Sequence, residues 1–450
     1  MPEQGWKPSA FNVELDAAGR RFVYNSISLQ MLELDEATLA CFRDSMDEIR
    51  LGGRCADERM LQCFLALGFV VPASEAEYER EQTQFSSSKA DRDTLKITLA
   101  PTMACNLRCS YCFQQDFAPS RNMKAEVQNG VIEFVRRKAA GSRRLVVQWF
   151  GGEPLLRYEQ IVSMTEAFQK ICAERDMIYE AEMLTNGTLL TPEIIDSFRR
   201  LSLRAIQIPM DGDIATYARR KGATLKRAED FHQFLLGHMP QLVAAVGSVK
   251  IRINVDRDNA DAGKDVVRMF NTHGCCDPRI DFRLGFLNTR DGIIECIPHD
   301  CLSDAEFAAA EADFRQFLAR EGFRVYDEPF RRKFPCAAPL ERNFTIDPSG
   351  RIGKCVPAIG SDESVFSRIY PENIERTIAE TSQADAPYAD YDPFESEMCR
   401  KCALLPVCLG SCPKLHVDGV AASCRVKEGF AEKVLFHHDR SRGAIDAPSA

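Results

Sequence analysis

Three cysteines lie close together in the segment CNLRCSYCF, which begins at Cys105. The other two are Cys109 and Cys112, so the spacing is C-x3-C-x2-C. Thiolates are the usual ligands of iron–sulfur clusters, and three on one short loop can bind three irons of a [4Fe–4S] cluster. A structural zinc site normally has four nitrogen or sulfur ligands, and the nearest histidine in sequence is His232. The spacing favours a cluster with one open iron, and zinc with a distant fourth ligand is the alternative.

A second group of cysteines lies in the last third of the chain: Cys336, Cys355, Cys399, Cys402, Cys408, Cys412 and Cys424. Four of them follow the pattern C-x2-C-x5-C-x3-C. A zinc ribbon is the alternative to an iron–sulfur site here, because C-x2-C is common in zinc sites. The remaining cysteines are scattered, and we expect most of them to be small buried hydrophobic residues: Cys41, Cys55, Cys63, Cys172, Cys275, Cys276, Cys296 and Cys301.

The composition predicts a cytoplasmic protein. Its 450 residues allow two or three domains, and no apolar run is long enough to span a membrane. The first residues lack the basic and apolar regions of a secretion signal. In a reducing compartment, 18 cysteines indicate metal or catalytic sites rather than disulfides. The net charge of −9 disfavours nucleic acid as a partner, since nucleic-acid-binding proteins usually have a basic patch.

The elements that must position the first trio belong to an alternating α/β region, residues 94–320. Six short apolar runs alternate with helical stretches, which predicts parallel strands with helical crossovers: LKITLAP, RLVVQWF, YEAEMLTNG, RAIQIPMDG, SVKIRINVD and RIDFRLGF. Periodicity does not distinguish an open doubly wound sheet from a partial barrel. In both, the site lies at the carboxyl ends of the strands, and the trio directly follows the first strand.

Four further regions flank this one. Residues 1–77 predict a small α+β module with two strands around an Ala-Gly turn and two helices. Residues 78–93 are polar and Ser-rich, which predicts a linker. Residues 321–437 combine short strands, frequent turns and the second cysteine group, and residues 438–450 predict a disordered tail.

The set of motifs resembles the radical S-adenosylmethionine (SAM) enzymes. CNLRCSYCF follows the first strand, and GGEP, TNG, MDG and RINVDRDN lie at later strand ends in the family's order. The resemblance implies a partial (β/α)6 barrel, a [4Fe–4S] cluster on the trio, and SAM as cofactor. It also implies a set of SAM-binding residues: Gly151, Gly152, Glu153, Pro154, Asn186, Arg227 and Asn254.

Two contacts with SAM follow from this resemblance. The backbone of the GGE turn would pair with the methionyl amine, and Arg227 would grip the carboxylate, although a solvated helix charge is the other interpretation of Arg227. Relatives often have a serine where this chain has Pro209. A hydroxyl contact is therefore not expected here, and the carboxylate contact should depend more on Arg227.

The second cysteine group resembles the SPASM domain, an auxiliary-cluster module of radical SAM peptide-modifying enzymes. The resemblance implies two further [4Fe–4S] clusters, three in all. One would be bound by Cys399, Cys402, Cys408 and Cys424, and the other by Cys336, Cys355 and Cys412. The latter set has three ligands. Either Cys301 or Cys296 completes it, or an iron stays open and binds a substrate thiolate.

Residues 1–77 resemble a RiPP recognition element, a winged-helix-like module that binds the leader of a ribosomally made precursor peptide by adding a strand to a sheet edge. An uncharacterised cap domain is the alternative.

Together these resemblances imply a radical SAM peptide maturase that uses a 5′-deoxyadenosyl radical to abstract hydrogen from the precursor and form a crosslink, with a Cys thioether as the first choice. The alternatives are a formylglycine-forming, sulfatase-maturase-like enzyme, and carbon–carbon or carbon–oxygen crosslinking, epimerising or decarboxylating maturases. Val356 after Cys355, and Gln114 at the end of the first motif, depart from the sulfatase maturases. The expected electron donor is a flavodoxin or ferredoxin, and no membrane partner is expected. The catalytic acid or base is unknown.

Overall fold

The computed structural model describes the chain in eight stretches and three single residues, which form two compact units. The described residues are 5–52, 55, 57–114, 122–287, 301–325, 331, 336–361, 365–382, 387–417, 424 and 426–442. The smaller unit comprises Met1–Ala90, Tyr326–Cys336 and Asp390–Asp446, and the larger comprises Asp91–Val325, Ala337–Ala389 and Ala447–Ala450. Among the described helices, none has the length and apolar character needed to cross a bilayer.

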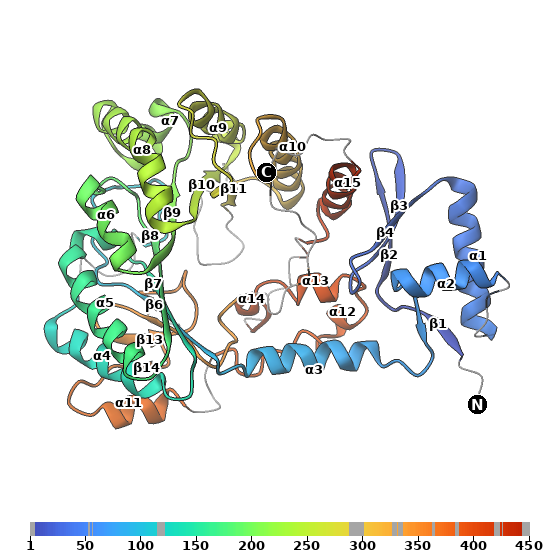
Figure 1. The fold of residues 1–450 in the computed structure, drawn as a ribbon, viewed down its shortest axis with the longest axis horizontal. Coiled ribbons are helices and arrows are strands. Elements are labelled where there is room, and N and C mark those ends of the chain that lie inside the picture. Colours follow the sequence, from blue (N-terminus) through green and yellow to red (C-terminus); the bar gives the residue numbers. More distant parts are fainter. Residues whose placement is uncertain are drawn as a thin grey trace. The chain divides into compact units, whose positions relative to one another are not determined.

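The larger unit is built on one nine-stranded sheet (Figure 1). Six strands are parallel neighbours in chain order, as predicted: β6 (Thr94–Leu99), β7 (Arg144–Trp149), β8 (Ile178–Leu184), β9 (Leu203–Pro209), β10 (Val249–Val255) and β11 (Ile280–Phe286). On its other edge β6 pairs with β12 (Asn343–Ile346), which leads to β13 (Arg351–Gly353) and β14 (Ser367–Arg368). Because β12 pairs with the outer edge of β6, β11 does not pair there and the curved sheet stays open. This confirms the predicted partial barrel.

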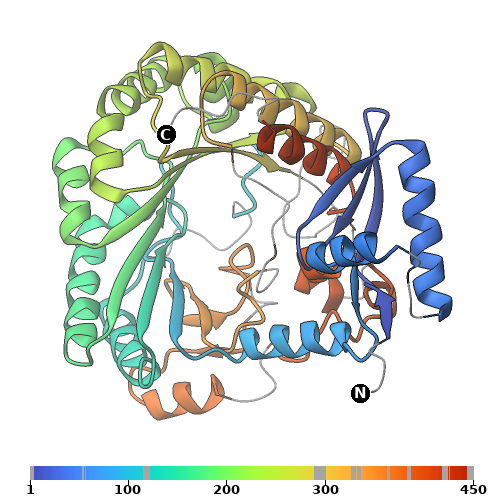
Figure 2. The same ribbon diagram turned by 45° about the vertical axis from the view of Figure 1, so that its right-hand side comes forward.

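Helices cover the outer side of this curved sheet (Figure 2). They are α4 (Ala125–Lys138), α5 (Tyr158–Ala173), α6 (Pro192–Arg200), α7 (Ile214–Lys221), α8 (Leu225–Val246), α9 (Ala262–Thr272) and α10 (Asp304–Arg320), with α11 (Ile374–Glu380) after β14. Successive strand side chains point to opposite faces. In β6 the apolar residues Leu95, Ile97 and Leu99 are fully buried, while Lys96 and Thr98 alternate with them. The polar positions of each strand therefore face the interior, where a substrate would be held.

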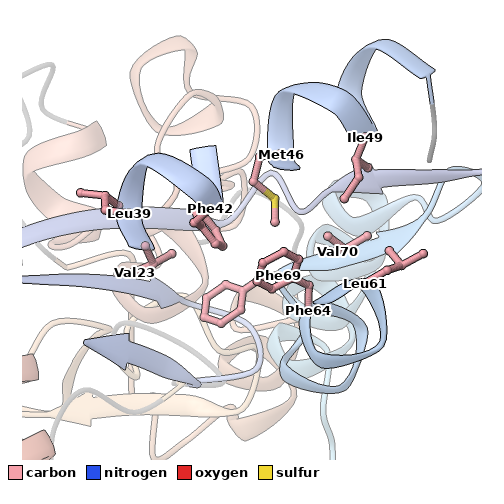
Figure 3. Close-up of a cluster of buried hydrophobic side chains, with 9 residues drawn as sticks. All are labelled: Val23, Leu39, Phe42, Met46, Ile49, Leu61, Phe64, Phe69 and Val70. Carbon is pink, nitrogen blue, oxygen red and sulfur yellow. The ribbon is translucent and has the colours of Figure 1, made fainter. Parts of the chain in front are cut away.

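The smaller unit contains a sheet with a hydrophobic cluster on each face. The sheet has the order β2 (Asn12–Ala17), β3 (Arg20–Asn25), β4 (Met31–Leu34), and β1 (Trp6–Pro8) pairs separately with β5 (Val70–Pro72). One face packs Val23 against α1 (Glu36–Gly52) and α2 (Glu58–Leu67), as Figure 3 shows. The opposite face packs Phe22 and Tyr24 against residues 335 positions or more later: Leu404, Val407, Phe430 and Val434. The N-terminal module therefore shares its core with the C-terminal cysteine region.

The predicted linker is a helix over most of its length. α3 (Glu77–Lys89) buries Glu77, Glu81 and Phe85, which lie four residues apart on one face. Phe85 and Tyr78 contact aromatic rings near residue 390, with centroids 6.1 Å apart for Phe85 and Tyr391. Glu81 forms an ion pair with Arg331. These partners are distant in sequence, so composition alone indicated a linker where tertiary packing stabilises a helix.

The C-terminal boundaries also differ from the prediction. The region predicted as one domain, residues 321–437, is divided between the units, because residues 337–389 belong to the larger one. The predicted tail begins inside α15 (Phe430–Ser441), whose buried His438 lies edge-on to Phe22 at 5.3 Å. The rest of the predicted tail, beyond Arg442, lies outside the described residues.

Candidate functional site

The predicted cluster loop follows β6 at its carboxyl end and is fixed by backbone hydrogen bonds to the end of α7 and to the turn after β7. The N–H groups of Arg108 and Ser110 donate to the carbonyls of Lys221 and Arg220, each at 3.0 Å. On the other side, the N–H of Glu153 donates to Ala104 O at 2.8 Å. The loop that carries the three cysteines is therefore positioned by the ends of β7 and α7 before any metal binds.

The three cysteines of the loop are partly buried free thiols. Burial raises the pKa of Cys109 to about 11, and burial also raises the pKa of Cys105. Metal binding to such thiols must displace their protons, so cluster loading and deprotonation are coupled. Among the described residues no three His, Cys, Asp or Glu side chains converge as a single metal ion requires. A cluster instead spreads its ligands over different irons, and an all-thiol donor set on a short loop suits iron–sulfur chemistry.

The GGEP turn fits closely against the cluster loop. Gly151 has φ +123°, and a Cβ atom there would clash with Thr102 O. A Cβ at Gly152 would lie 2.5 Å from Met103 O and would clash with Ala104. Both glycines are therefore required by the close approach of two backbones. Pro154 begins a short 3-10 helix, η1 (Pro154–Arg157).

The Glu153 side chain connects β7 with the end of β8. Its carboxylate is fully buried and accepts hydrogen bonds from Thr185 Oγ1 at 2.7 Å, Asn186 N at 2.7 Å and Leu155 N at 2.9 Å. Burial raises the pKa of Glu153 to about 7, although these three hydrogen bonds lower it. The side chain thus holds the strand ends together.

Asn186 is brought to the cluster loop, as predicted for a site residue. Its Nδ2 donates to Asn106 Oδ1 at 2.8 Å and lies 3.7 Å from Cys105 Sγ. Its Oδ1 accepts from the N–H and the hydroxyl of Thr188, at 2.9 and 2.7 Å. An N–H donor beside a cluster ligand is a recognised way to tune a cluster's reduction potential.

A buried polar cluster behind the loop was missed by the sequence reasoning. Asp211 and Lys221 are both almost fully buried, and Lys221 Nζ lies 2.7 Å from Asp211 Oδ2. Lys221 also donates to the hydroxyl of Tyr111, which in turn donates to Asp211. Tyr111 lies between Cys109 and Cys112, so this cluster anchors the cysteine loop from within. The signal was present in the MDG motif, because an aspartate that ends a buried strand needs a cation.

Two further contacts enclose this cluster. Arg220 Nη1 donates to Asp256 Oδ2 at 2.5 Å, and its guanidinium lies 5.1 Å from the centre of the Tyr111 ring. Asn254 donates from its backbone N–H to Asp211 Oδ1 at 2.9 Å and from Nδ2 to Tyr111 OH at 3.2 Å. The predicted residue Asn254 is therefore part of the site. Burial raises the pKa of Tyr111 well above its ordinary value, so its phenol stays protonated.

Arg227 is not brought together with the other predicted residues. It is exposed in the first turn of α8, where its backbone N–H donates to the N-cap hydroxyl of Thr224 at 3.3 Å. Within the described part of the chain, no hydrogen bond or ion pair links its side chain to the cysteine loop. The geometry favours the interpretation of Arg227 as a solvated helix charge.

Four of the C-terminal cysteines line one cavity in the smaller unit: Cys399, Cys402, Cys408 and Cys424. This is the set that the SPASM resemblance assigns to one auxiliary cluster. α12 (Glu397–Arg400) and α13 (Leu405–Cys408) bring the first three together, and Cys402 N donates to Cys399 O at 2.9 Å. Burial raises the pKa of Cys408 to about 11 and also raises the pKa of Cys399.

The chain reverses direction between Cys408 and Cys412. Leu409, Gly410 and Ser411 all have positive φ, at 50°, 78° and 67°. Non-glycine residues rarely adopt this conformation, and such strain persists only where the surroundings enforce it. The buried hydroxyl of Tyr391 donates to Leu409 O at 2.7 Å and holds the turn. α14 (Pro413–Val417) then starts directly after Cys412.

The other predicted auxiliary ligands are divided between the units. Cys336 and Cys412 belong to the smaller unit, and Cys355 follows β13 in the larger one. Of the two candidate fourth ligands, Cys301 is disulfide-bonded in the structure, and Cys296 lies outside the described residues. Among the scattered cysteines, Cys172 and Cys275 are buried as expected, whereas the expectation is wrong for three residues that are exposed: Cys41, Cys63 and Cys276.

Comparisons with known proteins agree with this geometry. Residues 99–240 match the radical SAM superfamily. The radical SAM cyclopropyl synthase TigE of Paramaledivibacter caminithermalis is 25% identical over 161 residues, which is 32% of this chain and 34% of that protein. A serine-type anaerobic sulfatase-maturating enzyme of Klebsiella pneumoniae is 33% identical over 98 residues, 21% of this chain and 25% of that one. The chain thus aligns with about a third or less of the length of these relatives.

Solved structures share the fold over much more of the chain. The structure of anSMEcpe with bound AdoMet and Kp18Cys peptide has a TM-score of 0.58 and 17% identity, and the match covers 78% of this chain and 99% of that one. Streptococcus suis SuiB bound to the precursor peptide SuiA has a TM-score of 0.51 and 13% identity over 92% of this chain and 97% of that one. Taken with the strand order and the cysteine loop at the end of β6, the sequence match shows that residues 99–240 lie in a domain of the radical SAM superfamily.

Proposed function

We propose that the protein is a radical SAM peptide maturase that abstracts hydrogen from a ribosomally made precursor peptide and forms a crosslink. The observation that carries the proposal is the presence of two preorganised cysteine sites in one chain. One is the loop with Cys105, Cys109 and Cys112, and the other is the cavity lined by four C-terminal cysteines. A peptide-modifying enzyme of this kind needs both a radical-generating cluster and an auxiliary one.

The residues around the first loop would bind and orient the cofactors. When bound, a reduced [4Fe–4S] cluster with SAM supplies a 5′-deoxyadenosyl radical able to remove an unactivated hydrogen. The three thiols of the loop would hold the cluster, and the backbone of Gly151 and Gly152 would lie within reach of the SAM amine. Lys221 and Asp211 keep Tyr111, and with it the loop, in place. The polar inner positions of the strands would orient the peptide over this site.

The C-terminal cysteines suit the second half of the reaction. Thioether formation from a C–H and a thiol removes one hydrogen atom, one proton and one electron. The radical would take the hydrogen atom, solvent the proton, and an auxiliary cluster, if bound, the electron. Cys399, Cys402, Cys408 and Cys424 would hold such a cluster, and Cys336, Cys355 and Cys412 a third one. A flavodoxin or ferredoxin would return electrons to the first cluster.

The N-terminal module would bind the leader of the precursor peptide. β4 is an edge strand of the described three-stranded sheet, so its outer backbone groups are available for an added strand. The match to SuiB covers 92% of this chain. A groove of about 630 Å³ beside β2 and α1 is lined by both charges, since its Arg43 and Arg50 form ion pairs with Glu14 and Asp47.

The thioether is our first choice of product because the set Cys336, Cys355 and Cys412 has three members. If its fourth position is taken by a substrate thiol, the metal deprotonates that thiol and holds it near the carbon radical. The disulfide at Cys301 leaves that residue without the free thiol that cluster ligation requires. This strengthens the open-iron alternative relative to ligation by Cys301.

Formylglycine formation is the second candidate, favoured by the 33% identity to the Klebsiella sulfatase-maturating enzyme. One experiment separates the two. The anaerobically reconstituted full chain is incubated with SAM, dithionite and the short precursor peptides encoded beside its gene. A peptide that loses two hydrogens, and whose cysteine resists iodoacetamide, supports a thioether. An aldehyde captured by a hydrazide probe supports formylglycine. Full iron loading without any 5′-deoxyadenosine would refute both.

A further inference from the structure

We propose that Arg252, rather than Arg227, binds the carboxylate of SAM; this inference rests on the function proposed above. Arg252 lies on β10 and faces the same side of the sheet as Asn254, two residues later. Its Nε donates to Asn254 Oδ1 at 2.8 Å, and Asn254 Nδ2 donates to Tyr111 OH at 3.2 Å. Two hydrogen bonds thus connect this guanidinium to the loop that carries the three cysteines.

Arg252 is the surplus cation of the buried polar cluster. Lys221 pairs with Asp211 at 2.7 Å, and Arg220 pairs with Asp256 at 2.5 Å. Within the described part of the chain, no carboxylate lies within ion-pair distance of Arg252. A cation withdrawn from water without a counter-ion is costly, so it recruits an anion where one can enter. Burial also lowers the pKa of Arg252, although Tyr111 and the charge of Asp211 act in the opposite direction.

The strand on one side of Arg252 has a glycine that leaves space for its side chain. The strand on the other side has a proline, which has no hydroxyl to compete for a carboxylate. On β11, Gly285 pairs in register with Asn254, and a Cβ at Gly285 would lie 2.6 Å from Arg252 Nε. On β9, Arg252 pairs in register with Pro209, which offers no hydroxyl or N–H group. The guanidinium therefore lies on the strand next to position 209, and it can grip a carboxylate with two parallel bonds.

The test compares two ligands that differ in the carboxylate-bearing end. S-adenosylhomocysteine carries the amino-acid end, and 5′-methylthioadenosine lacks it. Binding of both is measured by equilibrium dialysis on the anaerobically reconstituted full chain, for wild type, Arg252→Gln, Arg252→Lys and the control Arg227→Gln. We expect Arg252→Gln to weaken S-adenosylhomocysteine by about 10- to 100-fold, as for loss of a charged hydrogen-bond pair, and to leave methylthioadenosine unchanged. Arg252→Lys should lie between, and Arg227→Gln should match wild type.

Each other outcome has a definite meaning. Equal S-adenosylhomocysteine binding by wild type and Arg252→Gln overturns the inference, as does a tenfold loss in Arg227→Gln. If Arg252→Gln keeps cofactor binding but raises only the KM for the peptide, the anion belongs to the substrate and the inference is wrong. Wild type that neither loads iron nor binds S-adenosylhomocysteine refutes the proposed function itself.

A stability measurement separates ligand binding from a structural role. Because Arg252 lacks an ion-pair partner among the described residues, removing its charge should leave the Tm of the cluster-free chain unchanged or raise it. A marked fall in the Tm of both Arg252→Gln and Arg252→Lys would show that the side chain holds the fold, and would overturn the inference.

Discussion

Replacing Lys221 by methionine removes the cation from the buried cluster behind the cysteine loop. In the native chain Lys221 is 1% exposed and Asp211 is 0% exposed, so neither charge has water as an alternative partner. Methionine has a similar length and fills the space of the lysine side chain. Asp211 would retain the hydrogen bonds from Tyr111 and Asn254 and the longer contact with Arg220 Nε at 3.9 Å, but would lose the ion pair with its nearest cation at 2.7 Å.

The expected cost follows from leaving a buried carboxylate without its cation. Breaking a buried ion pair on one side costs about 3–5 kcal/mol, and the remaining hydrogen bonds place this variant near the lower figure. The free energy of unfolding of the larger unit should therefore fall by about 3 kcal/mol. Urea unfolding of the cluster-free chain measures it. In a Trp6→Phe background, fluorescence reports Trp149, which is buried in β7 of the larger unit.

The matched control is Lys226→Met, which breaks an ion pair with Asp230 between side chains that are 74% and 55% exposed. Exposed pairs of this kind contribute less than about 0.5 kcal/mol, so its unfolding curve should overlay that of the background. Adding Asp211→Asn to Lys221→Met should recover part of the loss, because the buried negative charge is then gone. If Lys221→Met unfolds at the same urea concentration as the control, the buried pair does not hold the loop and this reasoning is wrong.

Three other outcomes are expected. Gly152→Ala should reduce the iron bound by the loop, because its Cβ would lie 2.5 Å from Met103 O, whereas Gly237→Ala, with open space around it, should not; equal iron contents would contradict the close-approach argument. The folded-state pKa of Glu153, about 7, lies above its unfolded value near 4.5, so stability should fall as pH rises from about 5 to 7.5, by roughly 3 kcal/mol at ~1.4 kcal/mol per unit. Glu153→Gln should flatten that slope, and a variant with the same slope would refute the assignment. Colorimetric iron analysis of the reconstituted chain should give about twelve irons per chain. Replacing Cys399, Cys402, Cys408 and Cys424 together by alanine should remove about four of them. The cysteines of the first loop should still support SAM cleavage in that variant.

Elements with local signals were predicted well. The six parallel strands of the larger unit have β-branched and leucine residues in short runs, and each ends at a turn motif. α2 begins at the N-cap Asp57 and ends at Gly68, whose φ of 78° is the left-handed conformation expected of a helix-ending glycine. The helix over 77–89 was missed because its buried face, Glu81 and Phe85, finds its partners near residues 331 and 391. A segment with so few apolar residues forms a stable helix only when residues distant in sequence pack against its buried face.

The sequence by itself determined which cysteines are candidates for metal clusters, since their number and spacing can be seen independently of any fold. It also determined that the cysteine loop and the GGEP turn lie at one edge of a parallel sheet. Only the tertiary structure decided which charged residues share that edge. Arg227 and Arg252 are the same residue type, yet Arg227 is exposed on α8 and Arg252 faces the interior from β10. Side-chain direction depends on strand register and on how far a helix turns before it packs, and both are set by contacts between residues far apart in the chain.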